Sequence, residues 1–517
     1  MHVYDLHTAY LAASNILLPH NPDEKRKKER KRLPNACRAY GIEGWENIDK
    51  GTIAEDIGEG RWQEHGVSAV FEYCEEDVRM SVRLLRAQIA GNPKFPAADV
   101  FRVLYWSNYS AKAVARIQAA GIPIDVRLWH LVQENKAAVI QALIAHYDPS
   151  YGSEDPIYTP EGEWSYERFE RWLVRISVKC WTRLDSERLD IDSDAFRIMY
   201  HVPGIEALHA LRDSLGIVVR ARLPIGRDGR NRPSLFPFGT ATGRNAHSKS
   251  LYNAHACMRS FMKFPEDRIG VYLDWRTQEV GVAAALSADQ KLIEAYSSGD
   301  VYHALAVTCG YTKEPNAKLW KRTCSDVRDR MKRLQLAITY GMGVPSLAKG
   351  LNSHPLIASN IIEKHRREYP VFWHWREDRV TSAMLNRRIS SVDGWPMHIS
   401  TSPNKRTIYN FPMQSGGAVM LREAASRMCE QGLVPCMLVH DGILFEARSM
   451  HQVEHAKQIM RDAGRDVCRG LEIAADTDQE LHNGARYRDK RSVAQRMWTT
   501  MMQTLQKIGA LPEGSLP

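Results

Sequence analysis

The sequence lacks the features that mark membrane, secreted and zinc-binding proteins. It has no run of about 18 apolar residues, which excludes a membrane-spanning helix. The residues from Met1 to Tyr10 lack the basic start and the apolar stretch of a signal peptide. The nine cysteines are scattered without a CxxC pair, which argues against a zinc site or a disulfide framework. We therefore expect a soluble cytoplasmic protein with reduced thiols.

Length, composition and charge narrow the class of protein further. A chain of 517 residues is too long for one hydrophobic core, so about two to four structural units are expected. The net charge of +9 fits either a plain basic protein or one that binds a polyanion such as DNA. The dense basic run Lys25–Arg32 leaves the same choice open, because most such runs are solvated surfaces.

The order of the expected elements indicates a mixed fold. Helical spacing of apolar residues covers residues 67–89 and most of residues 138–219. From residue 269 onward, short β-like runs alternate with long helices, which predicts an α+β domain.

Two segments place carboxylates at the ends of β-like runs. Asp274 ends one such run, and Glu279 lies in the first turns of the helix that follows. A strand-end aspartate is more often a helix cap than a metal ligand. Asp441 and Gly442 stand between two apolar runs, which predicts a hairpin with a type I′ turn and positive φ at both residues. His440 adds a polar group that an ordinary buried hairpin does not need.

A third segment, Cys324–Met342, carries cations and an aromatic ring at helical spacing. Arg328, Lys332, Leu336 and Tyr340 follow one another at four-residue steps, so they form one slanting stripe on a helix, about 18 Å long. The stripe suits a nucleoside triphosphate, with the phosphates at the two cations and the base at the tyrosine. Taken alone, a solvated basic helix face is the more common explanation.

Together, in this order, the three segments resemble the motifs of family A DNA polymerases, the bacterial polymerase I-like and phage-type class. The family carries a strand aspartate with a glutamate five residues on, then an R-x3-K-x7-Y-G helix, then a V-H-D hairpin. Three further segments match family motifs: Thr242–Arg244, Gly299–His303, and Arg406 with Asn410, Pro412, Met413 and Gln414. The resemblance covers about residues 95 to 490.

The resemblance implies an α+β right-hand polymerase fold with a thumb, a palm built on an antiparallel sheet, and helical fingers. A partial RNase H-like exonuclease domain precedes it. The implied boundaries are 1–92 for the partial 3′–5′ exonuclease-like domain, 93–245 for the thumb and connecting region, 246–290 for the first part of the palm, 291–398 for the fingers, and 399–517 for the second part of the palm and the C-terminal helices.

The resemblance also implies template-directed extension of a DNA primer with dNTPs in a bacterial or phage-infected cytoplasm, without a membrane partner. Asp274 and Asp441 would hold two Mg²⁺ ions, for which Mn²⁺ can substitute. Lys332 would neutralise the phosphates and protonate the leaving group, and Arg328 would clamp the γ-phosphate. The other implied dNTP-binding residues are Glu279, His303, Leu336 and Tyr340. The implied contacts to primer-template DNA are Arg244, Arg406, Asn410, Gln414 and His440.

Several residues depart from the family pattern. Gly442 stands where the family usually has a second acid, and Leu336 stands where it usually has Phe or Tyr. Three substitutions flank motif residues: Trp275, Arg276 and Gln335. Because both central aspartates are retained, we still expect catalysis.

The N-terminal region shows a partial exonuclease signature. Tyr73 and Asp77 match the Y-x3-D motif of DEDDy proofreading exonucleases, and their spacing puts them on one helix face. No D-x-E on an apolar strand precedes Tyr73. We therefore expect no proofreading by this chain alone. Either a separate chain supplies the front half of the domain, or Met1 lies inside a longer ancestral reading frame. An ordinary solvated helix face is the simpler alternative for the Y-x3-D spacing.

Three other functions remain open from the sequence. A degenerate accessory protein would bind primer-template without extending it, although the intact aspartates argue against this. A nuclease built on Tyr73 and Asp77 would lack further carboxylates. A reverse transcriptase or RNA polymerase with a related palm is the third. Glu279, as a steric gate at the sugar, disfavours RNA synthesis but leaves the choice of DNA or RNA template open.

Overall fold

The computed structural model describes residues 4–15, 33–43, 53, 56–57, 61–93, 95 and 97–512, the last range with gaps at 179, 185, 201, 221–222, 254–255, 352 and 401–402. The basic run Lys25–Arg32 therefore lies outside the described residues. Within the described part of the chain, no helix has both the length and the apolarity to cross a bilayer.

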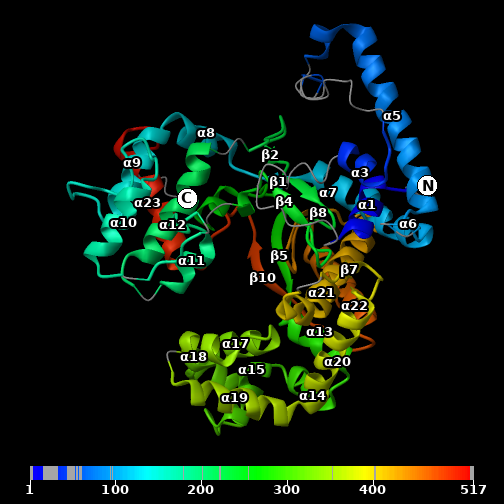
Figure 1. Cartoon of the computed structure of the whole chain (residues 1–517). Coiled ribbons are helices and arrows are strands. Elements are labelled where there is room, and N and C mark those ends of the chain that lie inside the picture. Colours follow the sequence, from blue (N-terminus) through cyan, green and yellow to red (C-terminus); the bar gives the residue numbers. More distant parts are fainter. Residues whose placement is uncertain are drawn as a thin grey trace.

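A four-stranded antiparallel sheet with the order β10–β5–β9–β8 lies at the centre of the molecule (Figure 1). Its strands are β5 (Ile269–Trp275), β8 (Pro435–Val439), β9 (Gly442–Ala447) and β10 (Ala475–Leu481). The register pairs Asp274 with Gly442 on one side and with Asp476 on the other. Almost every residue of β8 and β9 is buried, as expected for strands covered by helices.

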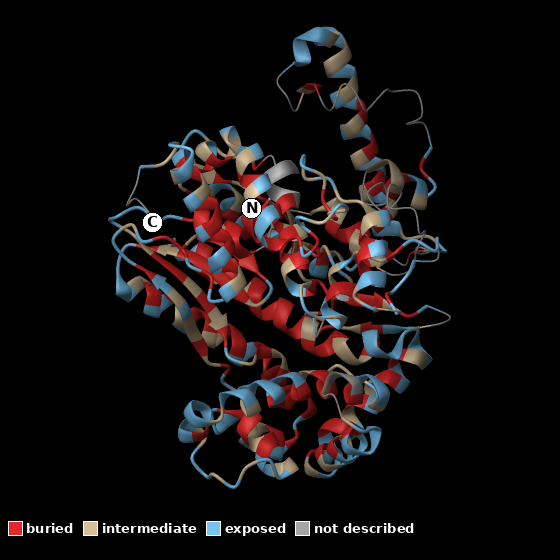
Figure 2. Ribbon diagram, turned by 90° about the vertical axis from the view of Figure 1, so that its left-hand side faces the viewer, coloured by how far each residue is buried: buried red, intermediate tan, exposed pale blue. Residues whose placement is uncertain are grey.

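Three helices build the core next to this sheet: α13 (Gln278–Ser287), α21 (Lys405–Glu430) and α22 (Met450–Val467). α22 packs on β5, β9 and β10, while α21 packs on α13, α22 and β8. Glycine permits the close approach of α13 and α21, since a Cβ at Gly416 would lie 2.7 Å from Val282 Cγ1. Buried residues concentrate in these helices and the sheet (Figure 2).

A helical lobe lies at one end of the sheet and has its own apolar core, which includes Trp320, Met331 and Phe372 (Figure 1). Its helices are α14 (Gln290–Ser297), α15 (Val301–Cys309), α16 (Ala317–Thr323), α17 (Ser325–Thr339), α18 (Val344–Leu351), α19 (Pro355–Glu368) and α20 (Pro370–Asn386).

A second helical lobe joins the middle of the chain to its C-terminal helix. It contains α8 (Val126–Glu134), α9 (Lys136–Tyr147), α10 (Tyr166–Arg175), α11 (Ser193–Ile198), α12 (Ile205–Arg220) and α23 (Ser492–Lys507). α23 packs on α8, α9 and α12. The lobe confirms the helical character expected of residues 138–219.

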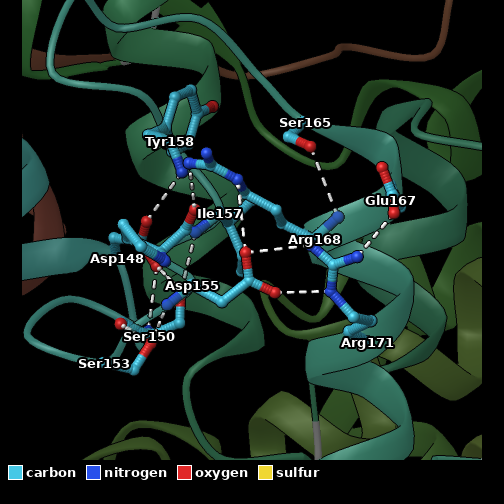
Figure 3. A network of polar contacts seen from close by, with 11 residues as sticks. Asp148, Ser150, Ser153, Asp155, Ile157, Tyr158, Ser165, Glu167, Arg168 and Arg171 are labelled. Carbon is cyan, nitrogen blue, oxygen red and sulfur yellow. Dashed lines mark hydrogen bonds and ion pairs between the residues drawn. The ribbon is translucent and has the colours of Figure 1, made fainter.

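Polar contacts fix the loop between α9 and α10 (Figure 3). Asp148 accepts hydrogen bonds from the backbone N–H groups of Ser150 and Tyr158. Asp155 forms ion pairs with Arg168 and Arg171, which lie on α10. These contacts hold the loop against α10.

The N-terminal region is helical where it is described. It contains α1 (Leu6–Ser14), α3 (Leu33–Ala39), the 3₁₀-helix η1 (Trp62–His65) and the long α5 (Gly66–Ala90), which confirms the helix expected over residues 67–89. The chain continues through α6 (Val100–Asn108), the π-helix η2 (Tyr109–Val114) and α7 (Ala115–Ala120).

Short strand pairs and 3₁₀-helices connect these parts. β1 (Ile122–Pro123) pairs with β2 (Arg230–Asn231), β3 (Ser234–Phe236) with β4 (Ala246–Ser248), and β6 (Arg388–Ser390) with β7 (Pro396–His398). The 3₁₀-helices η3 (Leu251–Asn253) and η4 (Ala256–Phe261) lead into β5.

Candidate active site

The hairpin between β8 and β9 turns one residue earlier than the sequence predicts. Its two-residue loop is His440–Asp441, and Gly442 is already the first residue of β9, paired with both Val439 and Asp274. Only His440 takes the left-handed conformation, with φ of 55°. The predicted turn at Asp441 and Gly442 is therefore wrong, because pairing with β5 draws Gly442 into the sheet.

This register brings the two predicted carboxylates together. Asp274 lies opposite Gly442, so it is a neighbour of Asp441 across the sheet. Burial raises the pKa of Asp274, and the charge of Asp441 raises it further. Burial also raises the pKa of Asp441, and the positive charge of Lys332 lowers the pKa of both aspartates. The two groups thus interact with each other and with a cation on α17.

One oxygen of this pair lacks a partner inside the protein. Asp274 Oδ1 is buried and has no hydrogen-bond donor. A buried carboxylate oxygen without a donor is costly unless a cation binds it. Among the described residues, no set of three or more His, Cys, Asp or Glu side chains is arranged to hold a metal. A metal ion here would therefore take its other ligands from substrate phosphates and water.

Further acids line the outer side of this site. Asp476 and Asp478 of β10 share a pocket with Asp274. Arg276 holds Asp476 through two hydrogen bonds of 2.7 Å, and Lys490 pairs with Asp478 at 2.7 Å. Asp274 is thus the carboxylate of this group that keeps a buried oxygen without a donor.

Glu279, near the start of α13, connects two predicted site residues. It accepts a hydrogen bond from Arg244 Nη2 at 2.7 Å and another from the Tyr340 hydroxyl. Burial raises the pKa of Glu279, while Arg244 lowers it. This carboxylate therefore holds the loop before the sheet against the C-terminal end of α17.

The predicted stripe on α17 is a helix face, but its residues have different surroundings. Arg328 Nε donates to Asp300 Oδ2 at 2.6 Å, and its guanidinium lies over the Tyr302 ring. Lys332 is exposed, and Leu336 is half-buried. Tyr340 is the C-cap of the helix.

His303 is not brought to this face. It is buried, its Nε2 lies 2.7 Å from the Glu314 carbonyl oxygen, and its ring packs edge-on against Trp320. In this structure the histidine belongs to the core of the helical lobe rather than to the cluster around the two aspartates.

The predicted DNA contacts lie on α21 and on the hairpin loop. Arg406, Asn410 and Gln414 follow at four-residue steps, which puts them on one helix face. Asn410 Oδ1 is buried and has no hydrogen-bond partner. His440 lies in the hairpin loop, where partial loss of water around its ring lowers its pKa.

The sequence around this site matches a known protein family. The model for DNA polymerase family A matches residues 228–481, which span both aspartates and the α17 stripe. Residues 228–481 of the chain are a DNA polymerase family A domain. The predicted family is thereby confirmed.

Relatives of this family A chain are distant in sequence. DNA polymerase I of Chloroflexus aurantiacus is 25% identical over 277 residues, which is 49% of this chain and 29% of that protein. DNA polymerase I of Lactococcus lactis is 22% identical over 403 residues, 72% of this chain and 44% of that protein. The chain thus spans less than half the length of these curated relatives.

A solved structure shares the fold. It is described as the POL domain of Pol1 from M. smegmatis in complex with DNA primer-template and dNTP, and it is 16% identical to this chain. The match covers 92% of this chain and 80% of that one, with a TM-score of 0.61. The predicted α+β polymerase fold is confirmed by this likeness.

Two supporting residues of this family A chain were missed from the sequence. Arg422 on α21 donates to the Gly243 carbonyl oxygen at 2.7 Å and pairs with Asp393 at 2.6 Å, and both side chains are buried. Gly243 has φ of 75°, and a Cβ there would lie 3.3 Å from the Trp395 ring. The buried pair therefore holds the turn that presents Arg244. Arg422 and Gly243 are 179 positions apart in the sequence, so no local pattern could reveal their contact.

The two residues of the exonuclease-like motif lie on one helix. Tyr73 and Asp77 lie on α5, where burial and the Asp77 charge raise the pKa of the Tyr73 phenol. The expected sharing of one helix face is thus confirmed. Within described residues 4–93, every regular element is a helix, so no strand there carries the other exonuclease carboxylates.

Proposed function

We propose that this chain extends the 3′ end of a primer on a DNA template with dNTPs and releases pyrophosphate. The observation that carries the proposal is the buried pair of Asp274 and Asp441, with Asp274 Oδ1 lacking a donor inside the protein. Family membership and the likeness to a POL domain support it.

The residues present fit two divalent ions of the Mg²⁺ type. Asp274 and Asp441 supply hard carboxylate oxygens and leave room for substrate oxygens as further ligands. When bound, such ions lower the pKa of the primer 3′-hydroxyl and stabilise the leaving pyrophosphate. Burial raises the pKa of both carboxyls because it disfavours their charged forms. A bound cation would stabilise those charged forms, so the same burial favours cation binding.

The incoming nucleotide is proposed to lie along α17. Lys332 would meet the triphosphate, since its charge already acts on both aspartates, and it would donate a proton to the leaving group. Arg328 would reach the γ-phosphate by exchanging its partner Asp300 for the phosphate. Leu336 would line the sugar site, and Tyr340 the base.

Glu279 is proposed to exclude ribonucleotides. Its carboxylate is fixed by Arg244 and by Tyr340, so it stands at a rigid position beside the sugar site. A 2′-hydroxyl would meet this side chain. His303 is the weakest member of the proposed nucleotide site, because its ring nitrogen is engaged by a backbone carbonyl.

Primer-template DNA is proposed to lie across α21 and the hairpin loop. Arg244, Arg406 and Gln414, with Asn410 and His440, would contact the minor groove. Acceptors there are nearly the same for all base pairs, so such contacts read duplex shape rather than sequence.

The lobes are assigned accordingly. We infer that residues 93–245 form the thumb and connecting region, 246–290 the first part of the palm, 291–398 the fingers, 399–517 the second part of the palm and the C-terminal helices, and 1–92 the exonuclease-like part. Helices α15 to α20 all fall within 291–398. α23 packs on α9 and α12, so it is assigned to the thumb. A cytoplasmic location accords with this function.

The first test is primer extension with all four dNTPs and Mg²⁺. We expect Asp274→Ala and Asp441→Ala each to lower the rate by about 100-fold or more, because each removes a charge aimed at the reacting groups. Binding of primer-template, measured by fluorescence anisotropy, should change little. Asp267→Ala, at an exposed site, is the control. Tight binding without extension by the unmodified chain would instead indicate an accessory protein.

A second test addresses the exonuclease-like part. We propose that the chain alone does not degrade DNA and that proofreading requires a separate chain with the front half of the domain. Purified protein should leave labelled single-stranded DNA intact in Mg²⁺ or Mn²⁺. Degradation that disappears in Asp77→Ala would overturn this proposal.

A further inference from the structure

Helix α5 has two apolar faces, and the described residues cover one of them. Met80 and Leu84 are buried in a small core with α1 and α3. The opposite face exposes five large apolar side chains: Val67 (58%), Phe71 (70%), Val78 (64%), Val82 (43%) and Ile89 (47%). α5 extends away from the rest of the molecule (Figure 1).

These five side chains form a continuous strip rather than scattered exposures. At about 100° per residue, they all lie roughly 140–200° around the helix from Met80. From Val67 to Ile89 the strip is about 33 Å long at roughly 1.5 Å per residue. Single exposed apolar residues are normal on a protein surface, but a contiguous apolar strip marks an interaction surface.

Charge along α5 is separated by sign. The N-terminal half, from Gly66 to Asp77, carries four acids and no base, whereas residues 78–90 carry three arginines and no acid. Five of these charges lie along one edge of the strip, roughly 220–300° from Met80. They are Glu72, Glu75, Arg79, Arg83 and Arg86.

We propose that the strip binds the same strip of a second copy of this chain, with the two α5 helices antiparallel. A two-fold axis at Val78, midway between Val67 and Ile89, would bring the two charged edges to the same side of the pair. The acidic half of each helix then faces the basic half of the other. A parallel pair, with the two-fold axis along the helices, would put the two charged edges on opposite sides of the pair, where the acidic and basic halves could not meet.

Contacts within the chain define which charges act across the pair. Arg79 already pairs with Glu75 at 2.7 Å and Glu76 at 3.1 Å. Arg83 donates to the Glu43 carbonyl oxygen, a neutral partner. Glu72 lies six residues before Val78 and Arg83 five after, so the antiparallel pair sets Glu72 beside Arg83 of the second copy. Residues Tyr73 and Asp77 lie outside the strip, so this proposal is independent of the exonuclease question.

Sedimentation of the full chain over a range of concentrations tests the pairing. We expect the mass to rise from that of the 58.9 kDa chain toward twice that value. Phe71→Glu and Val78→Asp should each weaken association at least about tenfold without altering helix content. Leu385→Asp is the matched control, because Leu385 is 79% exposed on α20, away from the strip. A chain that stays monomeric at every concentration would overturn the proposal and point to a different protein as the occupant.

Charge reversal tests the orientation. Glu72→Arg and Arg83→Glu should each weaken association, and the two changes combined in one chain should restore it. Disulfide trapping gives a second measure in a Cys74→Ser background. Val67→Cys with Ile89→Cys should give a covalent dimer under oxidation, whereas Val67→Cys alone should not. Cross-linking by Val67→Cys alone would mean a parallel pair and would overturn the antiparallel arrangement.

Discussion

At the scale of single residues, Tyr272 explains the glycine in the hairpin. A Cβ at Gly442 would lie 2.2 Å from Tyr272 Oη and 2.3 Å from its Cζ. The phenol also donates to the Val439 carbonyl oxygen at 3.3 Å, just before the loop that carries Asp441. Burial raises the pKa of Tyr272, and the charges of Asp274 and Asp441 raise it further, so the hydroxyl remains a donor. The phenol occupies the space that a side chain at residue 442 would need.

The two positions should therefore be coupled in mutants. We expect Gly442→Glu to destabilise the protein by about 1–3 kcal/mol through overpacking. Tyr272→Ala should cost about 3–5 kcal/mol by leaving a cavity. The combined variant should be more stable than the sum of the two predicts, because the glutamate enters the vacated space. Denaturant unfolding measures all four proteins; additive effects within about 0.5 kcal/mol would contradict the coupling.

At the scale of elements, a buried histidine joins three helices of the proposed fingers. His365 of α19 is fully buried, and its Nδ1 accepts from Trp373 Nε1 at 2.9 Å. Its Nε2 lies 3.2 Å from Gln335 of α17, the residue that departs from the family asparagine. Burial, together with the positive charge of Arg376, lowers the pKa of His365 to about 3. The neutral ring is thus part of the packing.

This histidine predicts loss of stability in acid. The folded-state pKa lies below the unfolded value of about 6.5. The contribution is therefore complete above about pH 6.5 and is lost as pH falls toward 3, by about 1.4 kcal/mol per unit. We expect the unfolding midpoint of this lobe to fall between pH 6 and 4, followed by tryptophan fluorescence. His365→Gln should flatten that dependence, even if it lowers stability overall; an unchanged pH profile in this variant would contradict the assignment.

At the scale of the whole molecule, the C-terminal helix α23 packs against helices from the first half of the chain. The helix buries Met497, Trp498 and Met501 in the lobe that begins with α8. Before it, Arg486 pairs with Asp125 at 2.6 Å, at the start of α8. A lobe formed mainly by residues 126–220 therefore depends on residues about 270 positions further along the chain.

Removal of α23 should unfold this lobe selectively. α23 buries five large apolar side chains: Met497, Trp498, Met501, Met502 and Leu505. Each such side chain lost from a core costs about 2–5 kcal/mol, so a chain ending at Lys490 would lose about 10–25 kcal/mol, comparable to or greater than a typical domain's whole stability of about 5–15 kcal/mol. We expect limited proteolysis to cut within residues 126–220 while the sheet and the fingers stay protected. Met497→Ala, a milder change, should lower the unfolding midpoint without that cleavage. Full protection of the shortened chain would show that the lobe folds without α23.

The sequence by itself was enough to identify the candidate site residues that belong to local patterns. Asp274, Asp441 and the α17 stripe from Arg328 to Tyr340 were predictable, because a strand end, a hairpin signal and a four-residue step are each properties of a short segment. Six such segments in one order were enough to predict the family and the α+β fold.

Only the tertiary structure decided what depends on distant parts of the chain. Sheet pairing moved the hairpin loop to His440 and Asp441, and packing buried His303 against Trp320. Arg328 forms an ion pair with Asp300, and the Tyr272 side chain occupies the space beside Gly442. Each of these outcomes rests on a contact between elements, where burial and pairing outweigh local preference, so no pattern within one segment could reveal it.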